Sequence, residues 1–210
     1  LVAAKKGRNQ ALLKLGRTAE LDLTVANFSG MEVPISDFAE RVLAGVDFSK
    51  TRMSRPAFQK ADLTGSNFSG GSVYQGNFKD AKMAGVQFDN ASTYACDFSN
   101  ADLESAKFNG ADIREGNFQS ANLRWAIFAK ARAEKANFSH AVVKSANFKN
   151  AFLYGADFSS VDLSGHDLSG LEMQGARFVN AQLANTNLSN AMFAGPVAAF
   201  RDNEALHGPG

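Results

Sequence analysis

The residues able to perform catalytic or metal chemistry are few in this sequence. The 210-residue chain has one cysteine, Cys96, and three histidines, His140, His166 and His207. A single cysteine excludes an internal disulfide and a multi-cysteine metal site. The histidines do not have the spacing of metal ligands, and no glycine-rich phosphate loop or nucleophile elbow is present. We therefore predict that the protein has no catalytic residues, no metal site and no cofactor.

Asp and Asn are more numerous, but they recur at one position of a five-residue repeat, as Asp102, Asp112 and Asn122 do. That position suits turns, because short polar side chains hydrogen-bond to the nearby backbone. Paired carboxylates acting as acid and base would need a cleft. The repeat predicts an unbroken rod without a cleft, so we interpret these residues as structural and the protein as not an enzyme.

The elements that position these residues are set by the repeat. Every fifth residue from Leu23 to Phe193 falls in a single frame without insertion or deletion, and it is almost always large and apolar. Two positions before each such centre the residue is usually Ala, and one position before it is mostly Asp or Asn. A period of five matches neither a helix nor a strand. A chain that turns a corner every five residues can point both the small residue and the centre inward.

This motif, Ala-(Asp/Asn)-(Leu/Phe)-x-x, resembles the pentapeptide-repeat family. The resemblance implies an all-β fold, a right-handed quadrilateral β-helix (a solenoid) with four pentapeptides per coil. At this coil length the repeat gives about nine coils, stacked at the ~4.8 Å spacing of strands. Phe occupies every other centre from Phe28 to Phe158. We expect these rings to form ladders on two opposite faces, as core packing and not as a ligand site.

The repeat divides the chain into three segments. Residues 1–20 are basic and off the frame, and we predict an N-terminal helical cap that covers the exposed edge of the first coil. A membrane-surface or acidic-partner anchor is the alternative for this segment. Residues 21–195 are predicted to form the β-helix. Residues 196–210 are predicted to form a C-terminal cap and tail, in which Phe200 covers the last coil.

Three unusual residues fall at inward positions where a small side chain belongs. Cys96 is predicted to fill the core. His166 lies in the one coil in which Leu168 replaces the expected Phe, and a buried imidazole must find a hydrogen-bond partner there. Arg41 must either open its corner or extend its charged end to solvent.

The outer surface is uneven in charge and in hydrophobicity. Between Gly116 and Ala156 the only acid is Glu134, against six basic residues, and bulky apolar side chains occupy outward positions of the same coils. Aromatic residues among Arg and Lys are typical of a protein interface. We predict that this band binds a protein with an acidic or mixed surface through Arg124, Trp125, Ile127, Lys130, Arg132, Val142, Lys144, Lys149, Phe152 and Tyr154.

The alternative for this band is a solvated face with isolated aromatic residues. Tyr74 and Tyr94 are also outward and lie twenty residues apart in the sequence. They should stack on adjacent coils, either as a lesser contact or as surface packing.

These observations favour a non-enzymatic scaffold that serves as a structural or assembly subunit of a larger complex. A second hypothesis comes from the family resemblance, because fluoroquinolone-resistance members mimic DNA and bind DNA gyrase. Mimicry needs a strongly acidic rod, whereas this chain has 22 basic and 21 acidic residues. Binding of single-stranded nucleic acid is a third hypothesis, which the balanced charge does not favour. A homodimer through terminal coils, as in some family members, is a further alternative.

The sequence also bears on location. No apolar run approaches the ~20 residues of a membrane span, so we expect a soluble protein. The chain begins at Leu1 and shows no apolar secretion core, which fits either a trimmed targeting peptide or a truncated chain. Family members are frequent in cyanobacteria and in the thylakoid lumen. The resemblance therefore suggests an organellar location, in the thylakoid lumen or chloroplast, after removal of a targeting peptide.

Overall fold

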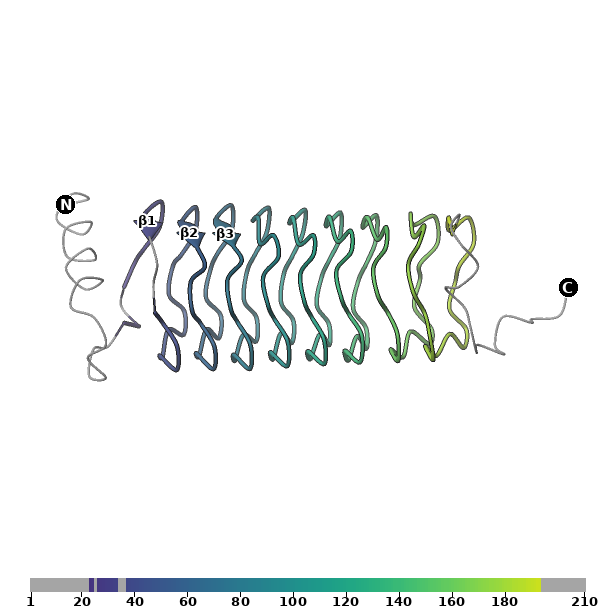
Figure 1. The fold of residues 1–210 in the computed structure, drawn as a ribbon, viewed down its shortest axis with the longest axis horizontal. Helices are drawn as coiled ribbons and strands as arrows, with labels where there is room; N and C mark the ends of the chain where they lie inside the picture. The colour runs from purple at the N-terminus through teal and green to yellow at the C-terminus, as the bar shows by residue number, and fades with distance from the viewer. Residues whose placement is uncertain (1–22, 25, 34–36, 194–210) are drawn as a thin grey trace, which may run out of the picture.

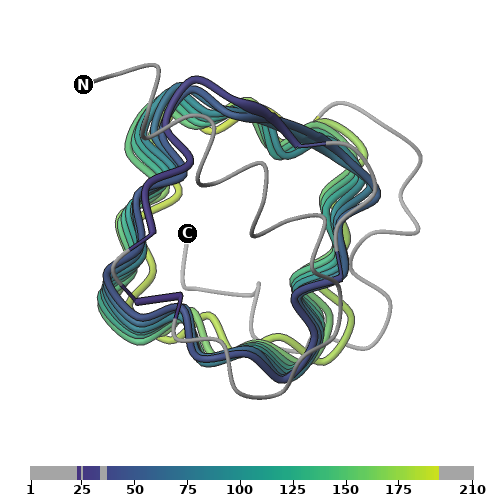
Figure 2. The same cartoon turned by 90° about the vertical axis from the view of Figure 1, so that its left-hand side faces the viewer.

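The computed structural model describes residues 23–24, 26–33 and 37–193, which form one long square coil (Figures 1 and 2). Residues twenty apart pair in parallel along this coil, from Asn27↔Asp47 to Glu172↔Met192. Each turn therefore takes twenty residues, with one pentapeptide to each of four sides. This all-β parallel arrangement confirms the predicted class of fold. The predicted helical caps lie outside the described residues, and the number of coils and the segment boundaries stay predictions.

Among the described residues, one side of the square carries continuous strands in three successive coils, and these stack in parallel in the order β1-β2-β3. They are β1 (Glu32–Val33), β2 (Arg52–Ser54) and β3 (Ser72–Tyr74). Most other sides contribute isolated bridges, because the next corner follows within a few residues. The described part of the chain contains no helix, and hence none that is long and apolar enough to cross a membrane.

Each corner forms at the residue two positions after a centre, where the backbone is left-handed. The backbone angle φ is 57° at both Ser105 and Trp125, which occupy this position in successive coils. The turn closes with a hydrogen bond of 3.0 Å from Ala106 N to Leu103 O. Gly and Asn are common at this position because they adopt left-handed φ values at low cost.

Asp and Asn before the centre stabilise the same corner. Glu104 N donates to Asp102 Oδ1 at 3.3 Å, and Ser99 N donates to Asp97 Oδ1 at 3.0 Å. This bond satisfies an amide that points away from the neighbouring coil. The structural role predicted for these side chains is therefore confirmed.

The core contains a double ladder of phenylalanine rings. Rings on adjacent coils stack with nearly parallel planes, at 4.7 Å between the ring centres of Phe48 and Phe68. Rings from opposite sides meet edge to face, at 5.8 Å for Phe58 and Phe68. Both geometries are favourable between aromatic rings. The predicted ladders on two opposite faces are confirmed from Phe28 to Phe158.

Two of the three unusual inward residues fit without disturbing the coil. Cys96 is buried: its thiol donates to Val73 O and accepts from Gly76 N, both at 3.2 Å. Burial raises the pKa of this thiol to about 12, so Cys96 is core filler, as predicted. Arg41 is half-buried, and Asp62 N still donates to Arg41 O at 2.8 Å, so its corner does not open.

Candidate functional site

The predicted interface residues lie on three sides of the coil. Residues 121–140 make one coil, whose four sides have Leu123, Phe128, Ala133 and Phe138 as their buried centres. The Leu123 and Ala133 sides are half a coil apart, so they face in opposite directions in the square cross-section (Figure 2). Arg124, Trp125, Val142 and Lys144 lie on the Leu123 side or its corner, Ile127, Lys130 and Lys149 on the Phe128 side or its corner, and Arg132, Phe152 and Tyr154 on the Ala133 side.

One cluster combines apolar surface with positive charge near the corner of the Leu123 side. Trp125 is 51% exposed and Val142 39% exposed, while Ile127 is half-buried. Arg124 Nη1 donates to Asn122 Oδ1 at 3.1 Å, and Asn122 pairs with Val142 in the next coil. The guanidinium is thus held close to the apolar group. We call this cluster the Trp125 patch; it consists of Arg124, Trp125, Ile127, Val142 and Lys144.

The second cluster lies on the opposite Ala133 side. Phe152 is 44% exposed and Tyr154 54% exposed. Arg132 pairs with Phe152 in the ladder, and its Nε lies 3.5 Å from Glu134 Oε1. We call Arg132, Phe152 and Tyr154 the Tyr154 patch. Lys130 and Lys149 lie between the two patches.

The Ala133 side carries further aromatic residues that sequence reasoning did not join to the interface. Tyr74 and Tyr94 stack at 5.9 Å, as predicted, and the Arg114 guanidinium lies 5.7 Å from the centre of the Tyr94 ring. Arg114 also donates to Asp112 over 2.7 and 2.6 Å, which holds the pKa of Asp112 below its usual range. Tyr154 lies a multiple of twenty residues after Tyr74 and Tyr94, so all three occupy equivalent positions in their coils. This period was the sequence signal that would have grouped the two earlier tyrosines with the predicted interface.

The ladder between coils is interrupted between residues 141–150 and 161–170. The backbone N–H groups of Val143, Ser145 and Phe148 have no hydrogen-bond partner among the described residues. Their equivalents one coil earlier all donate to the following coil, over 2.7–3.1 Å; these are Leu123, Trp125 and Phe128. Two successive sides of the square are therefore open at this level.

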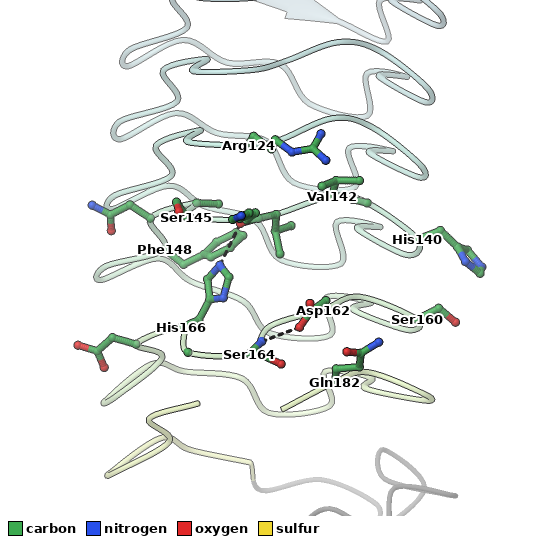
Figure 3. Close-up of a pocket in the computed structure, with 17 residues that line it drawn as sticks. Arg124, His140, Val142, Ser145, Phe148, Ser160, Asp162, Ser164, His166 and Gln182 are labelled. Atoms are coloured by element: carbon green, nitrogen blue, oxygen red, sulfur yellow. Dashed lines mark hydrogen bonds between the residues drawn. The ribbon is translucent and has the colours of Figure 1, made fainter. Parts of the chain in front are cut away.

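The opening is a wedge, because the two coils stay bonded on the other sides. Leu153 N donates to Glu172 O at 3.0 Å, and Phe158 N donates to Arg177 O at 2.8 Å. The wedge forms a cleft of about 850 Å³ that both coils line (Figure 3). The prediction of an unbroken rod without a cleft is wrong at this place.

His166 explains why the coils separate. Its Nε2 donates to Val143 O in the preceding coil at 2.9 Å, so the partner predicted for this imidazole is found (Figure 3). Its Nδ1 is buried without a hydrogen-bond partner. In the same column, Ser66 Oγ donates to Leu43 O at 2.8 Å while the ladder around it stays intact. The imidazole makes the same contact with a longer side chain, so it holds the two coils further apart.

Leu168 supplies space beside this imidazole. It stands where the ladder would place another Phe, so no ring stacks on Phe148 from the following coil, and Phe148 lines the cleft instead. The effect extends across the coil. Phe158 and Phe178 stack at 5.6 Å, compared with 5.0 Å for Phe138 and Phe158.

The polar side chains of the lower wall bond to their own neighbours. Ser164 N donates to Asp162 Oδ1 at 2.9 Å, and hydrogen bonds from Ser164 hold the pKa of Asp162 below its usual range. Hydrogen bonds from Ser169 lower the pKa of Asp167 in the same way. Within the described ranges, no group of three His, Cys, Asp or Glu side chains is placed to hold a metal ion. The upper wall includes the cationic side chains of Arg124 and Lys144, together with His140.

Two family models match the sequence. One, described as pentapeptide repeat region, matches residues 42–118. The other, described as pentapeptide repeats (8 copies), matches residues 116–153 and 136–170. Together these matches span more than half of the chain. The chain belongs to the pentapeptide-repeat family.

Several solved structures are similar to this pentapeptide-repeat chain. QnrB1, a plasmid-mediated fluoroquinolone resistance protein, is 17% identical with a TM-score of 0.46, covering 77% of this chain and 74% of that one. HetL, involved in heterocyst differentiation regulation in the cyanobacterium Nostoc, is 20% identical with a TM-score of 0.33, covering 90% and 96%. A pentapeptide repeat protein from the Arabidopsis thaliana thylakoid lumen is 30% identical with a TM-score of 0.34, covering 49% and 68%. No protein with a curated description matches the sequence.

The pentapeptide repeat accounts for the coil, the corners and the ladders, but it does not account for the cleft. Sequence reasoning placed His166 and Leu168 in one coil without predicting the opening. The available signal was the length of the His166 side chain, because the residues before it in the same column are all small, namely Ala26, Val46, Ser66, Val86, Ala106, Ala126 and Ala146.

Proposed function

We propose that this pentapeptide-repeat protein is a non-enzymatic scaffold that binds protein partners as a structural or assembly subunit of a larger complex. The observation that carries the proposal is the exposure of Trp125 (51%) and Tyr154 (54%) on a rod whose other large apolar side chains are mostly buried. Aromatic residues flanked by Arg and Lys form the energetic centre of many protein interfaces. Exposed apolar side chains that form a patch with a polar rim mark an interaction site more often than single exposed ones do.

The opposite positions of the two patches refine this proposal. A partner that docks against one side of the rod by a standard interface covers about 800 Å² of it. Such a partner cannot reach the other side without wrapping around the rod. The Trp125 patch and the Tyr154 patch therefore suit two partners, held on opposite sides at a fixed separation. Both partners should present acidic or mixed surfaces, because each patch includes basic side chains.

Mimicry of DNA is the second hypothesis, and the charge distribution argues against it. A duplex mimic must present a dense array of negative charges. The formal net charge of this chain is +1, and both patches include basic residues. The suggested thylakoid or chloroplast location rests on the family resemblance alone and stays part of the proposal.

Affinity capture from the native source, with the full chain as bait, tests the scaffold. We expect Trp125→Ser and Phe152→Ser each to lose a different set of stoichiometric partners at moderate salt. Val42→Ser is the matched control, because Val42 is 59% exposed in the column of Val142 but lies several coils away. Thermal unfolding should be equal for all variants. Unchanged capture by both patch variants would reject the proposal, and recovery of DNA gyrase would restore mimicry.

A further inference from the structure

The two walls of the cleft present backbone groups in the pattern of a strand edge. The upper wall, residues 141–150, has the unbonded N–H groups of Val143, Ser145 and Phe148. The lower wall, residues 161–170, has the carbonyl groups that would accept them if the coils were in register. It also has N–H groups that lack acceptors, at Asp162 and Asp167.

A ligand that satisfies both walls must both donate and accept hydrogen bonds. A simple anion accepts hydrogen bonds but donates none, and a metal cation contacts only oxygen atoms, here the carbonyl groups and the carboxylates of Asp162 and Asp167, and leaves the N–H groups unbonded. An extended peptide offers donors and acceptors in alternation, which is how a strand adds to an exposed edge. Each open side of the square is five residues long, so at ~3.3 Å per residue it matches a segment of about five residues. The cleft volume of about 850 Å³ is within the range of known ligand sites.

The side chains around the cleft select the chemistry of such a peptide. The floor is apolar and almost fully buried, with Val143 at 1% and Phe148 at 2% exposure. The upper wall carries Arg124 and Lys144 at the mouth, while the carboxylates of the lower wall, Asp162 and Asp167, accept hydrogen bonds from their own neighbours. Alternate side chains of a strand point in opposite directions. A fitting segment would therefore place an apolar side chain on the floor and an acidic side chain at the mouth.

We propose that the cleft beside His166 binds an extended peptide segment of a partner protein, with main-chain hydrogen bonds to both walls and an acidic side chain against Arg124 and Lys144. His166 is the spacer that keeps the cleft open. The inference deepens the proposed function, on which it rests, because Arg124, Val142 and Lys144 belong both to the Trp125 patch and to the cleft wall.

The test is a selection of random octapeptides displayed on phage, with the full chain as target and His166→Thr as counter-target. Thr186 Oγ1 bonds to Leu163 O at 2.9 Å in the next coil while the ladder there stays intact. His166→Thr should therefore keep the bond to Val143 O and close the cleft. We expect peptides enriched in Asp or Glu that bind this variant at least about tenfold more weakly, as loss of several main-chain hydrogen bonds implies.

Amide hydrogen exchange locates the peptide. In the free protein Val143, Ser145 and Phe148 should exchange faster than Leu123, Trp125 and Phe128, and a selected peptide should protect them. N-methylation of alternate residues in that peptide removes its donors without changing its side chains, and should weaken binding by at least about tenfold. A selection that yields no binding peptide, or binding that N-methylation leaves unchanged, would overturn the proposal even if His166→Thr failed to close the cleft.

The same variants separate the two proposals. Trp125 does not line the cleft, so Trp125→Ser should lose protein partners and still bind the selected peptide. If no peptide binds the cleft but Trp125→Ser still loses partners, the peptide proposal is rejected and the scaffold proposal stands. If neither patch variant loses partners although the peptide binds, the scaffold proposal fails and the cleft remains a peptide site.

Discussion

Single side chains at inward positions decide whether adjacent coils of this protein stay in register. Cys96 and Ser66 occupy such positions and bond to carbonyl groups of the preceding coil without disturbing the ladder. His166 makes the equivalent bond from a longer side chain, and the ladder beside it is lost on two sides. The difference is length, because all three side chains find a partner. Burial of a polar group is thus tolerated here when its bond fits the coil spacing.

Thr93, unlike Cys96 and Ser66, has a buried polar group without a hydrogen-bond partner. It is a centre, fully buried, and its Oγ1 makes no hydrogen bond. Thr93→Val keeps the shape and removes the unsatisfied hydroxyl, so we expect it to stabilise the protein by about 1–2 kcal/mol. Urea unfolding measures the change.

Thr51→Val is the control for this prediction. Thr51 is equally buried, but its Oγ1 donates to Phe48 O at 2.6 Å. Its replacement should destabilise the protein by about 1 kcal/mol. The same sign of change for both variants would show that the missing partner of Thr93 is not what matters.

At the scale of one element, the side and its corner form a unit in which each residue has a fixed task. The small residue and the centre fill the core, the Asp or Asn bonds to the turn, and the left-handed residue changes direction. A side is too short to be stable alone, because its ladder bonds, such as those from Leu103 N to Asn122 O and from Asn122 N to Ala101 O, all go to the coils above and below it. Stacking on the next coil therefore supplies most of its stability.

The phenylalanine ladder should carry much of that stacking energy. Phe108 is fully buried and stacks on Phe88 and Phe128, both at 5.1 Å. Phe108→Ala removes these contacts and leaves a cavity, so we expect a loss of about 3–5 kcal/mol in the free energy of unfolding. Phe152→Ala, at an exposed site, is the matched control and should cost less than about 1 kcal/mol. Urea unfolding measures both changes. Equal losses of unfolding free energy in the two variants would show that the phenylalanine ladder does not stabilise the protein in this way.

At the scale of the whole molecule, the rod behaves as a row of coils that contact only their neighbours. Stability in such a solenoid is a sum of terms for each coil and for each interface between coils. The wedge between residues 141–150 and 161–170 removes part of one interface. It therefore divides the described rod into a long part before the cleft and a short part after it.

Native-state hydrogen exchange should detect this division. We expect Leu163 and Leu168, which donate to the following coil, to open at a free energy about 2 kcal/mol below that of Leu103 and Phe108, since two or more ladder bonds are missing. His166→Thr should reduce the difference. If the difference in opening free energy stayed the same in His166→Thr, fraying at the end of the rod would be its cause instead of the wedge.

The sequence by itself determined the architecture, because a period of five with two inward positions leaves the backbone no regular path except a corner in every repeat. The phenylalanine ladders and the structural role of Asp and Asn followed from that frame and are confirmed. The ten interface residues were also chosen from the sequence, and the length of the coil already assigned them to different faces. Trp125 and Tyr154 lie in neighbouring coils, but about half a coil separates the directions in which they face.

Only the tertiary structure decided where the rod opens. Whether His166 fits depends on the distance from its backbone to Val143 O compared with the reach of an imidazole, and a composition pattern does not contain that distance. Leu168, which follows His166 in the same repeat, contributes to the same opening because it leaves Phe148 without a ring stacked on it from the following coil. The cleft thus depends on how the length of the His166 side chain compares with the spacing between two coils. That comparison needs both coils, which are twenty residues apart in sequence, placed one above the other.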